Sequence, residues 1–243
     1  MGPQTQNQNQ NQNQNQPMPH NSIYLPTFFE GHDPELGRAL MAEHPLSTLV
    51  SIDDTGAPLV SHLPLKCEAH LLGSSDKTKD KAQEEWVLWG HFARINAQVK
   101  ALQTNPKALA IFMGPQAYMS PSVYPDLARV PTWNYVTLHA QGEVEFLDEP
   151  QTKDQLLKQL IADHELSYVA QWKALSEEYQ SKMLGAIIGF KMRVTHCQFK
   201  IKINQHRPEA HEKMLDQYAH GSESMQGLAR WMERLGLPKV KPQ

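Results

Sequence analysis

The sequence predicts an α+β fold, a β-barrel with flanking helices, over most of its 243 residues. At least six segments are typical of strands, mostly with short connections between them and with helical segments around them. The longest strand, 187–203, changes the phase of its apolar side chains part-way, which suits the bent strands of a small closed barrel. A hydrophobic content of 40% is ordinary for a globular chain and excludes collagen-like, coiled-coil and wholly disordered classes.

Composition divides the chain into three parts. Residues 1–16 contain seven Gln and five Asn in an alternating repeat, which has no apolar side chains to offset the entropy of ordering. We therefore expect residues 1–22 to form a disordered extension, residues 23–207 to form the barrel domain, and residues 208–243 to form a C-terminal helical segment.

Hydropathy and cysteine content suggest a location for the protein. The longest apolar run, 108–113, is far shorter than the roughly 20 residues of a membrane-spanning helix, and the polar N-terminus does not resemble a secretory signal. The only cysteines, Cys67 and Cys197, form no disulfide framework, so we expect two buried free thiols. These features predict a soluble, cytoplasmic protein with no membrane partner.

Charge argues against a simple nucleic-acid binder, because the net charge is −3 and DNA-binding modules are usually basic. Residues 191–243 are the exception, with ten Lys and Arg against five Asp and Glu. This excess is a faint indication of a surface that faces a polyanion, and a solvated face is the favoured interpretation.

The first elements have clear boundaries. Asp33 as N-cap and Pro34 at the first helical position predict a helix that ends before Pro45. Strands over 46–52 and 58–65 then form a predicted hairpin, in which Gly56 supplies the positive φ of the turn.

The rest of the chain alternates strands and helices. Residues 68–85 and 114–134 are expected to be loops, the second rich in proline and aromatic residues. The expected strands are 86–92, 108–113, 135–146 and 187–203, and the expected helices are 95–102, 150–165, 175–186, 208–219 and 222–235. The change of phase in 187–203 predicts a β-bulge near residues 195–198.

Common catalytic signatures are missing from the sequence. There is no G-x-S-x-G elbow, no dinucleotide or Walker glycine loop and no H-E-x-x-H motif. The 12 histidines lack the spacing of metal ligands, so we expect no metal site and assign no catalytic residue.

Three stretches concentrate polar groups that a core does not need: 62–65, 90–96 and 118–124 with 131–135. Arg94 lies where a strand gives way to a helix, and helical N–H groups with a guanidinium can bind a phosphate. The alternatives are that Arg94 is a surface ion-pair residue and that Trp133 is a core aromatic.

These stretches together resemble the PaiB family, described as FMN-binding negative transcriptional regulators. The resemblance rests on HLPL at 62–65, GHFARIN at 90–96, FMGPQAYMSPSVY at 112–124, VPTWNY at 130–135 and NQHR at 204–207, and it runs in order from Tyr24 to Pro208. It implies an FMN-binding split barrel and a homodimer with the flavin in a cleft between the subunits.

The resemblance also assigns site residues. His91, Ala93, Arg94 and Asn96 would hold the phosphate and ribityl chain, and His62, Leu63, Pro64 and Leu65 would lie beside the isoalloxazine. Ser120, Tyr124, Thr132, Trp133 and Asn134 would close the pocket, with Gln205 and Arg207 approaching from the last strand. Two positions depart from the family: Val123 replaces a usual Trp, which removes an aromatic wall, and His206 replaces a usual Asn.

The leading functional hypothesis is a homodimeric transcriptional repressor that binds FMN or another small planar ligand and acts on promoter DNA. No segment forms a clear helix-turn-helix, and the C-terminal helices are the nearest candidates for DNA contact. The alternatives are a flavin- or haem-dependent oxidoreductase of the split-barrel superfamily and a ligand-free structural dimer, because a fold does not fix a function.

Overall fold

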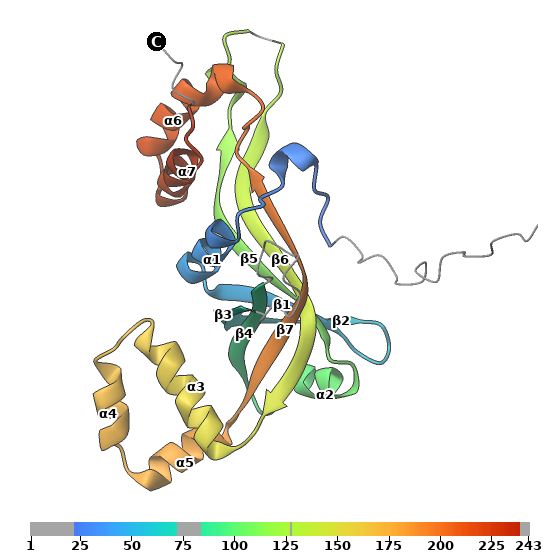
Figure 1. Ribbon diagram of the computed structural model, residues 1–243, viewed down its shortest axis with the longest axis vertical. Helices are drawn as coiled ribbons and strands as arrows, with labels where there is room; N and C mark the ends of the chain where they lie inside the picture. Colours follow the sequence, from blue (N-terminus) through green and yellow to red (C-terminus); the bar gives the residue numbers. More distant parts are fainter. Residues whose placement is uncertain (1–21, 72–83, 127, 239–243) are drawn as a thin grey trace, which may run out of the picture.

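The computed structural model describes residues 22–71, 84–126 and 128–238. They form one antiparallel sheet of seven strands in the order β2-β1-β5-β6-β7-β4-β3 (Figure 1). The strands are β1 (Leu46–Ile52), β2 (Pro58–Pro64), β3 (Lys66–Leu71), β4 (Glu84–Ala93), β5 (Lys107–Met119), β6 (Thr132–Leu147) and β7 (Ile187–Lys202). Apart from Ser22, the predicted disordered extension lies outside the described residues.

Helices surround this sheet. They are α1 (Pro34–Glu43), α2 (Ala97–Thr104), α3 (Pro150–Ala162), α4 (Tyr168–Ala174), α5 (Glu177–Gly185), α6 (His211–Ala219) and α7 (Glu223–Arg234), with short 3₁₀ turns η1 (Thr27–Phe29), η2 (Pro121–Val123) and η3 (Pro208–Ala210). In Figure 1, α6 and α7 lie near one end of the long strands, while α3, α4 and α5 form an arm at the other end. No helix among the described residues is long and apolar enough to cross a membrane.

The sheet curls so that its two edges approach each other. Leu65 directly follows edge strand β2, and a Cβ built on Gly90 of β4 would lie only 2.5 Å from its Cδ2. The same Cβ would lie 2.9 Å from Phe190 Cζ, so Gly90 leaves the space that these two side chains fill. The enclosed interior contains fully buried Leu49, Leu88, Phe92, Phe112 and Leu138.

The first helix and hairpin follow their predicted boundaries. The Asp33 side chain accepts a hydrogen bond from Glu35 N at 2.9 Å and caps α1, whose Leu40 and Met41 are buried in the core. Gly56 has φ +88° in the turn between β1 and β2, a conformation that glycine adopts without steric cost.

The predicted bulge in the long strand is confirmed. Gln141 pairs with His196 and Gly142 pairs with Val194, so Thr195 is an extra residue on β7. One inserted residue turns the following side chains over, which explains why Ile188 and Phe190 point into the core before the bulge and Phe199 and Ile201 after it.

Several elements differ from the sequence prediction, and residues 132–134, expected in a loop, belong to strand β6. Residues 66–71 form strand β3 although the loop 68–85 was expected there, because β3 pairs with β4 as an exposed edge; residues 72–83 lie outside the described residues. Strand β5 continues to Met119 through Pro115, which is tolerated because a register shift between Met113 and Gln116 removes Pro115 from the ladder. Helix α4 was not expected; its Trp172 is buried within the arm, where its Nε1 donates to Asp154 on α3 at 2.8 Å.

Candidate functional site

The first group of predicted site residues surrounds the start of α2. Asn96 is the N-cap: its Oδ1 accepts from Gln98 N and its Nδ2 donates to Ser61 Oγ, both at 2.9 Å. This second bond joins α2 to β2, one residue before His62. The His62 ring is exposed and its Nδ1 lies 3.1 Å from Thr48 Oγ1.

The neighbouring strand residues have different environments. Leu63 and Pro64 are half-buried, whereas Leu65 is buried in the core. Ala93 is exposed, and its carbonyl accepts from Asn96 N at 2.9 Å. His91 pairs with Gly189, its Nδ1 is buried without a partner among the described residues, and burial lowers its pKa.

Arg94 is bound within its own chain. Its Nη1 donates to Asp148 Oδ2 at 2.9 Å and its Nη2 to the other carboxylate oxygen, while Nε and Nη2 also donate to the carbonyls of Gly185 and Ile187. The hydrogen bond to Asp148 raises the pKa of Arg94, and Arg94 and Lys153 hold the pKa of Asp148 well below its usual range. The cation expected at a phosphate therefore already has a carboxylate partner.

The second group lies where β5 and β6 meet their connecting loop. Ser120 caps η2, and its Oγ accepts from Ser122 N at 3.2 Å. The Tyr124 hydroxyl lies 2.9 Å from Nδ2 and 3.2 Å from Oδ1 of Asn204. Asn204 has φ +60°, a left-handed conformation in which Asn is among the better-tolerated residues.

Trp133 is not a core aromatic, because 55% of its surface is exposed. It packs edge-on against Tyr118, with ring centroids 6.2 Å apart. Beside it, Thr132 Oγ1 accepts a 2.6 Å hydrogen bond from Lys202 Nζ. An exposed indole, a phenol and an ammonium group thus share one end of the sheet.

Asn134 points to the opposite side of β6 from Trp133. It is buried, and its Nδ2 donates to the hydroxyl of Tyr218 on α6 at 2.8 Å. Burial raises the pKa of Tyr218 to about 12, so this hydroxyl stays protonated at neutral pH. Asn134 therefore joins β6 to the C-terminal helices and does not face Trp133.

The last two predicted residues lie after β7. Gln205 folds back on its own strand, where its Oε1 accepts from Ile203 N at 3.0 Å and its Nε2 donates to the Ile201 carbonyl. Arg207 is half-exposed, with Nη1 3.9 Å from Glu209 Oε1. Both lie between β7 and η3 in the chain, and α6, which follows η3, lies near one end of the long strands in Figure 1.

The two groups do not meet within one chain. Thr48 pairs with both His62 and Ile111, so His62 lies level with Ile111 on the sheet. Tyr118 pairs with Trp133 and follows Ile111 by seven residues, which corresponds to roughly 23 Å of strand. One small ligand can touch both groups only if two copies of the chain supply them.

One face of the sheet, its outer face, runs from His62 to Trp133, and residues 22–30 lie over part of it. Ser22 bonds to His139 and Gln198 there and Glu30 forms a bridge with Lys200, so Thr137, Gln198 and Lys200 are buried. The residues of this face, read from the strand registers, are Thr48, Val50, Val60, His62, Leu109, Ile111, Met113, Gln116, Tyr118, Trp133, Tyr135, Thr137, His139, Gln141, His196, Gln198, Lys200 and Lys202. This part of the strands contains no Asp or Glu and has two lysines. Met113 is 47% exposed, so the face is also partly apolar.

Both lysines were missed in the prediction from sequence. Lys200 Nζ donates to the Tyr24 carbonyl at 2.6 Å and lies 5.4 Å from the ring centroids of both Tyr24 and Tyr135. No carboxylate of the described residues forms an ion pair with Lys200 or Lys202, and burial together with the Lys200 charge lowers the pKa of Lys202. The bulge at Thr195 was the signal that could have found them, because it places even-numbered residues outward beyond it.

The arrangement fits an anionic, planar cofactor. Aromatic and apolar side chains offer area to a flat ring, the partly exposed Lys202 without an acidic partner offers charge, and Asn96 with Ser61 offers polar groups at a helix start. FMN, which joins a phosphate to a conjugated ring, needs these three kinds of contact: apolar area for its ring, and positive charge and polar groups for its phosphate.

Comparison with known families decides the relationship. Residues 23–196 match the family model described as "Putative FMN-binding domain". The chain belongs to this FMN-binding family. Gln205, Arg207 and helices α6 and α7 lie beyond the matched residues.

Two curated relatives cover most of the chain. The protease synthase and sporulation protein PAI 2 of Bacillus subtilis is 30% identical over 77% of this chain and 84% of its own. This relative confirms the PaiB resemblance. An uncharacterized protein of Emericella nidulans is 25% identical over 68% of this chain and 78% of its own.

Solved structures confirm the split-barrel fold. The FAD and heme binding protein of Mycobacterium smegmatis is similar with a TM-score of 0.52 and 15% identity, over 72% of this chain and 74% of its own. A flavocytochrome of Azotobacter vinelandii gives 0.54 and 14%, over 73% and 71%. At these identities the likeness concerns the fold alone.

Proposed function

We propose that the protein is a homodimeric, cytoplasmic transcriptional repressor of the PaiB type, whose two FMN molecules lie between the subunits. One observation carries the proposal: His62 and Trp133 lie on the same outer face but are roughly 23 Å apart. Two copies related by a two-fold axis, with these faces together, bring the second group of one copy to the first group of the other.

Each group has a role in this cleft. Asn96, Ser61 and the first turn of α2 bind the phosphate, since a helix N-terminus stabilises negative charge. Trp133 and Tyr118 of the second copy cover the ring. Bound FMN supplies a ring that accepts electrons, and the residues named here hold it and exclude water.

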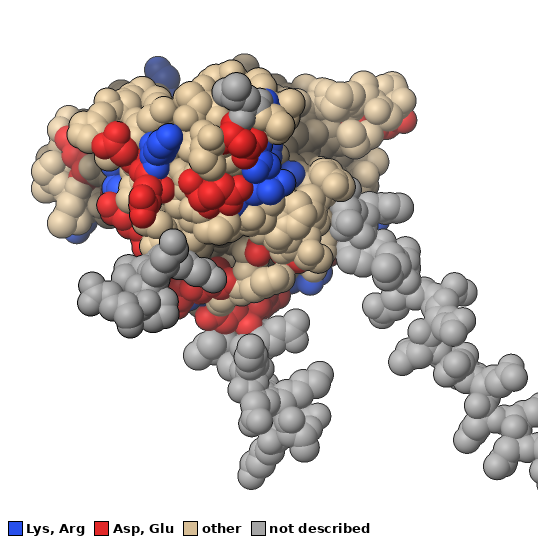
Figure 2. All heavy atoms as spheres, turned by 90° about the horizontal axis from the view of Figure 1, so that it is seen from above, with Lys and Arg blue, Asp and Glu red and all other residues tan. Residues whose placement is uncertain are grey.

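The regulatory part of the proposal is supported by the PaiB relationship. The basic excess of the C-terminal quarter does not by itself support DNA contact, because Lys191, Arg193 and Arg234 pair with acidic residues from elsewhere in the chain. Seen from the end of the molecule in Figure 2, acidic and basic side chains are interspersed.

A charge reversal at the phosphate tests the site. Asn96→Asp keeps the carbonyl-type oxygen that caps α2 but places a negative charge beside the phosphate. FMN affinity should fall about tenfold or more, which is the size of one charged hydrogen bond exchanged for repulsion. Riboflavin lacks the phosphate, so its affinity should stay within about twofold.

Gln103→Glu is the matched control, because it adds the same charge at an exposed position of the same helix. Fluorescence titration of each variant with FMN and riboflavin gives the comparison. Equal losses of both ligands, or an equal effect of Gln103→Glu, would exclude Asn96 from the phosphate site.

Two further measurements test the assembly and the role. Light scattering should give twice the chain mass of 27.6 kDa, and a monomer at micromolar concentration would exclude a shared cleft. A promoter fragment should shift in a salt-sensitive way. Retention of flavin with reduction by a nicotinamide donor, and no DNA shift, would instead favour an oxidoreductase.

A further inference from the structure

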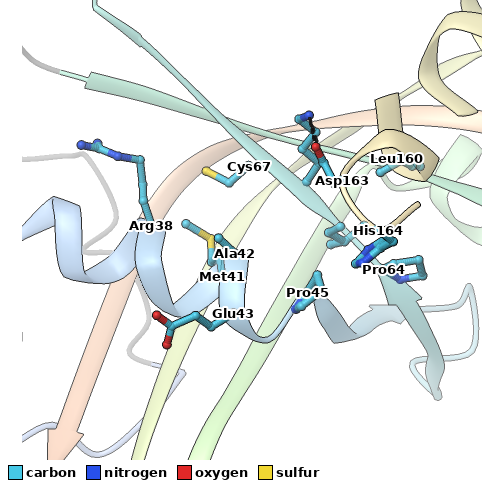
Figure 3. A pocket seen from close by; sticks show the side chains of 12 residues that line it. Arg38, Met41, Ala42, Glu43, Pro45, Pro64, Cys67, Leu160, Asp163 and His164 are labelled. Carbon is cyan, nitrogen blue, oxygen red and sulfur yellow. Dashed lines mark hydrogen bonds and ion pairs between the residues drawn. The ribbon is translucent and has the colours of Figure 1, made fainter. Parts of the chain in front are cut away.

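A pocket separate from the outer face lies between the barrel and the helical arm (Figure 3). It has a volume of about 560 Å³, within the range of small-molecule sites. Helix α1 forms one wall, the turn from β2 to β3 forms another, and the end of α3 closes the third side.

The lining is apolar at its base and charged at its rim. Met41, Pro45, Pro64, Leu65 and Leu160 supply the apolar part, and the first four come from the barrel side. Met41 and Leu65 belong to the buried core, so this base is fixed by the packing of the barrel. A preformed apolar base favours a ligand with an apolar body.

All four charged residues of the rim already have partners. Lys66 Nζ lies 2.9 Å from Asp163 Oδ2, a pair that crosses from β3 to the end of α3 and is drawn in Figure 3. Arg38 pairs with Glu84, and Glu43 accepts from Arg234 Nη1 at 3.1 Å. A charged ligand would have to break one of these pairs, whereas an uncharged ligand leaves them intact.

The Cys67 sulfur also lines the pocket, but it adds no charge to the lining. Burial raises the pKa of the Cys67 thiol to about 12, so it is uncharged and unreactive at neutral pH. The exposed His164 ring has no side-chain partner among the described residues, and it can donate or accept one hydrogen bond at the rim.

We propose that this pocket is a second ligand site, which binds a small uncharged molecule with an apolar body between α1 and α3. The apolar base takes the body of the ligand, and His164 binds one polar edge. Because the ligand would touch both the barrel and the arm, its binding holds these two parts together. The inference does not depend on FMN, because Pro64 and Leu65, which the family resemblance places beside the isoalloxazine, line this pocket and have no role in the proposed flavin cleft.

Two fluorescent probes with the same aromatic body test the ligand class. Phenylnaphthylamine is uncharged, and anilinonaphthalene sulfonate carries one negative charge. The full-length protein should bind the uncharged probe saturably, one per chain, and more tightly than the sulfonate. Saturating FMN should leave this binding unchanged, whether or not FMN itself binds.

Filling the pocket from its exposed rim tests the location. Ala42→Trp and His164→Trp each place a large side chain in the pocket from a position that does not belong to the core. Either variant should weaken the uncharged probe by roughly tenfold or more, because the indole takes apolar area from it. Ala170→Trp is the control, since Ala170 is exposed on α4 and does not line the pocket.

Circular dichroism first has to show that all three variants fold. The probe titrations then distinguish a site in the pocket from binding elsewhere. Loss of probe binding in Ala42→Trp and His164→Trp, with none in Ala170→Trp, supports the site. Unchanged binding in both, displacement of the probe by FMN, or tighter binding of the sulfonate would overturn it. Because FMN binding is measured in the same samples, failure of the flavin assignment would be recognised separately.

Discussion

Arg94 and Asp148 form a bidentate ion pair that joins the end of β4 to the residue after β6. Lys153 Nζ, in the first turn of α3, donates to Asp148 Oδ1 at 2.9 Å. One carboxylate therefore connects the barrel to the arm, and it does so through side chains that are 54 and 5 residues away in sequence.

Removing this carboxylate should change the acid sensitivity of the protein. Arg94 and Lys153 lower the pKa of Asp148 in the folded chain, so its contribution to stability is present above the unfolded pKa of about 4 and is lost as pH falls through the lower, folded value. Asp148→Asn should therefore reduce the melting temperature at pH 7 and flatten its fall below pH 4. The effect is modest because half of the side chain is exposed.

Glu143→Gln is the matched control, since Glu143 also pairs with an arginine, Arg193, but across the exposed sheet and away from the arm. Melting curves between pH 7 and pH 3 give the comparison. If Asp148→Asn and the parent lose stability in parallel below pH 4, the ion pair contributes nothing to folding.

Arg94→Ala should lower stability as well as any phosphate affinity. The substitution leaves Asp148 without one partner and the carbonyls of Gly185 and Ile187 without their donor. Arg193→Ala, which removes one exposed cross-strand pair, is the control and should change the melting temperature less. A stable Arg94→Ala protein that loses FMN but keeps riboflavin would instead show a direct phosphate contact.

The fold was predictable where one segment of sequence decides the geometry. Asp33 and Pro34 start a helix by local chemistry, and the phase change around Thr195 requires an extra residue whatever lies beside it. Strand β3 was not predictable in this way, because its polar side chains suit an exposed edge and only pairing with β4 makes it a strand.

The site was less predictable, because its partners are distant in sequence. No feature of the sequence around Arg94 shows that its guanidinium forms an ion pair with Asp148. Trp133 and Asn134 are adjacent, yet one is 55% exposed and the other 1%, and the helix that covers Asn134 begins about 80 residues later. The prediction therefore named residues on several strands but could not state which of their side chains are exposed and which are already bonded within the chain.

The bulge gives a test with two single-residue deletions. Deleting Thr195 removes the extra residue, so the pairing of β6 with β7 becomes continuous and Phe199 and Ile201 still face the core. Deleting Gln198 shortens the same segment by one residue, but keeping Phe199 and Ile201 in the core then places His196 opposite the buried Ala140. The first deletion should fold with reduced stability, and the second should lose clearly more stability because it buries an imidazole.

Circular dichroism and thermal melting compare the folding and the melting temperatures of the two deletion variants. Similar stability of the two proteins would mean that Thr195 is not the inserted residue.

Gly142 gives a second test of the bulge. It should tolerate Ala better in the Thr195 deletion, because in the parent a Cβ there would lie 2.3 Å from the Arg193 carbonyl oxygen at the bulge.

Truncation should distinguish the Asn-Gln repeat from the residues that follow it. Removing residues 2–21 should leave the melting temperature unchanged, since a polar repeat offers little apolar area to bury. Removing residues 2–25 also takes away Ser22, which donates to Gln198, and Tyr24, whose carbonyl binds Lys200. That longer truncation should destabilise the protein. Equal melting temperatures would show that residues 22–25 contribute nothing.

Trp133→Phe tests whether the aromatic end of the sheet covers the flavin ring. The indole is 55% exposed and touches Tyr118 edge-on, so the variant should fold with a change in stability of no more than about 0.5 kcal/mol. In the proposed dimer this ring lies on the FMN of the other copy, and the smaller phenyl ring covers less of it. FMN affinity should fall by about threefold to tenfold, the cost of roughly 1 kcal/mol of aromatic contact.

Tryptophan emission gives a second readout of the same contact. FMN should quench the parent more than Trp133→Phe, and the difference between matched titrations isolates Trp133 from the signals of Trp86, Trp89, Trp172 and Trp231. Tyr179→Phe is a control on the arm, because it alters an exposed aromatic side chain that no part of the proposed cleft includes. Because Trp133 and Asn96 lie in different groups, loss of FMN in both variants, with a dimeric mass retained, requires that two copies build one site. Full affinity and unchanged quenching in Trp133→Phe would place the indole outside the cleft and leave only the α2 end as a flavin contact.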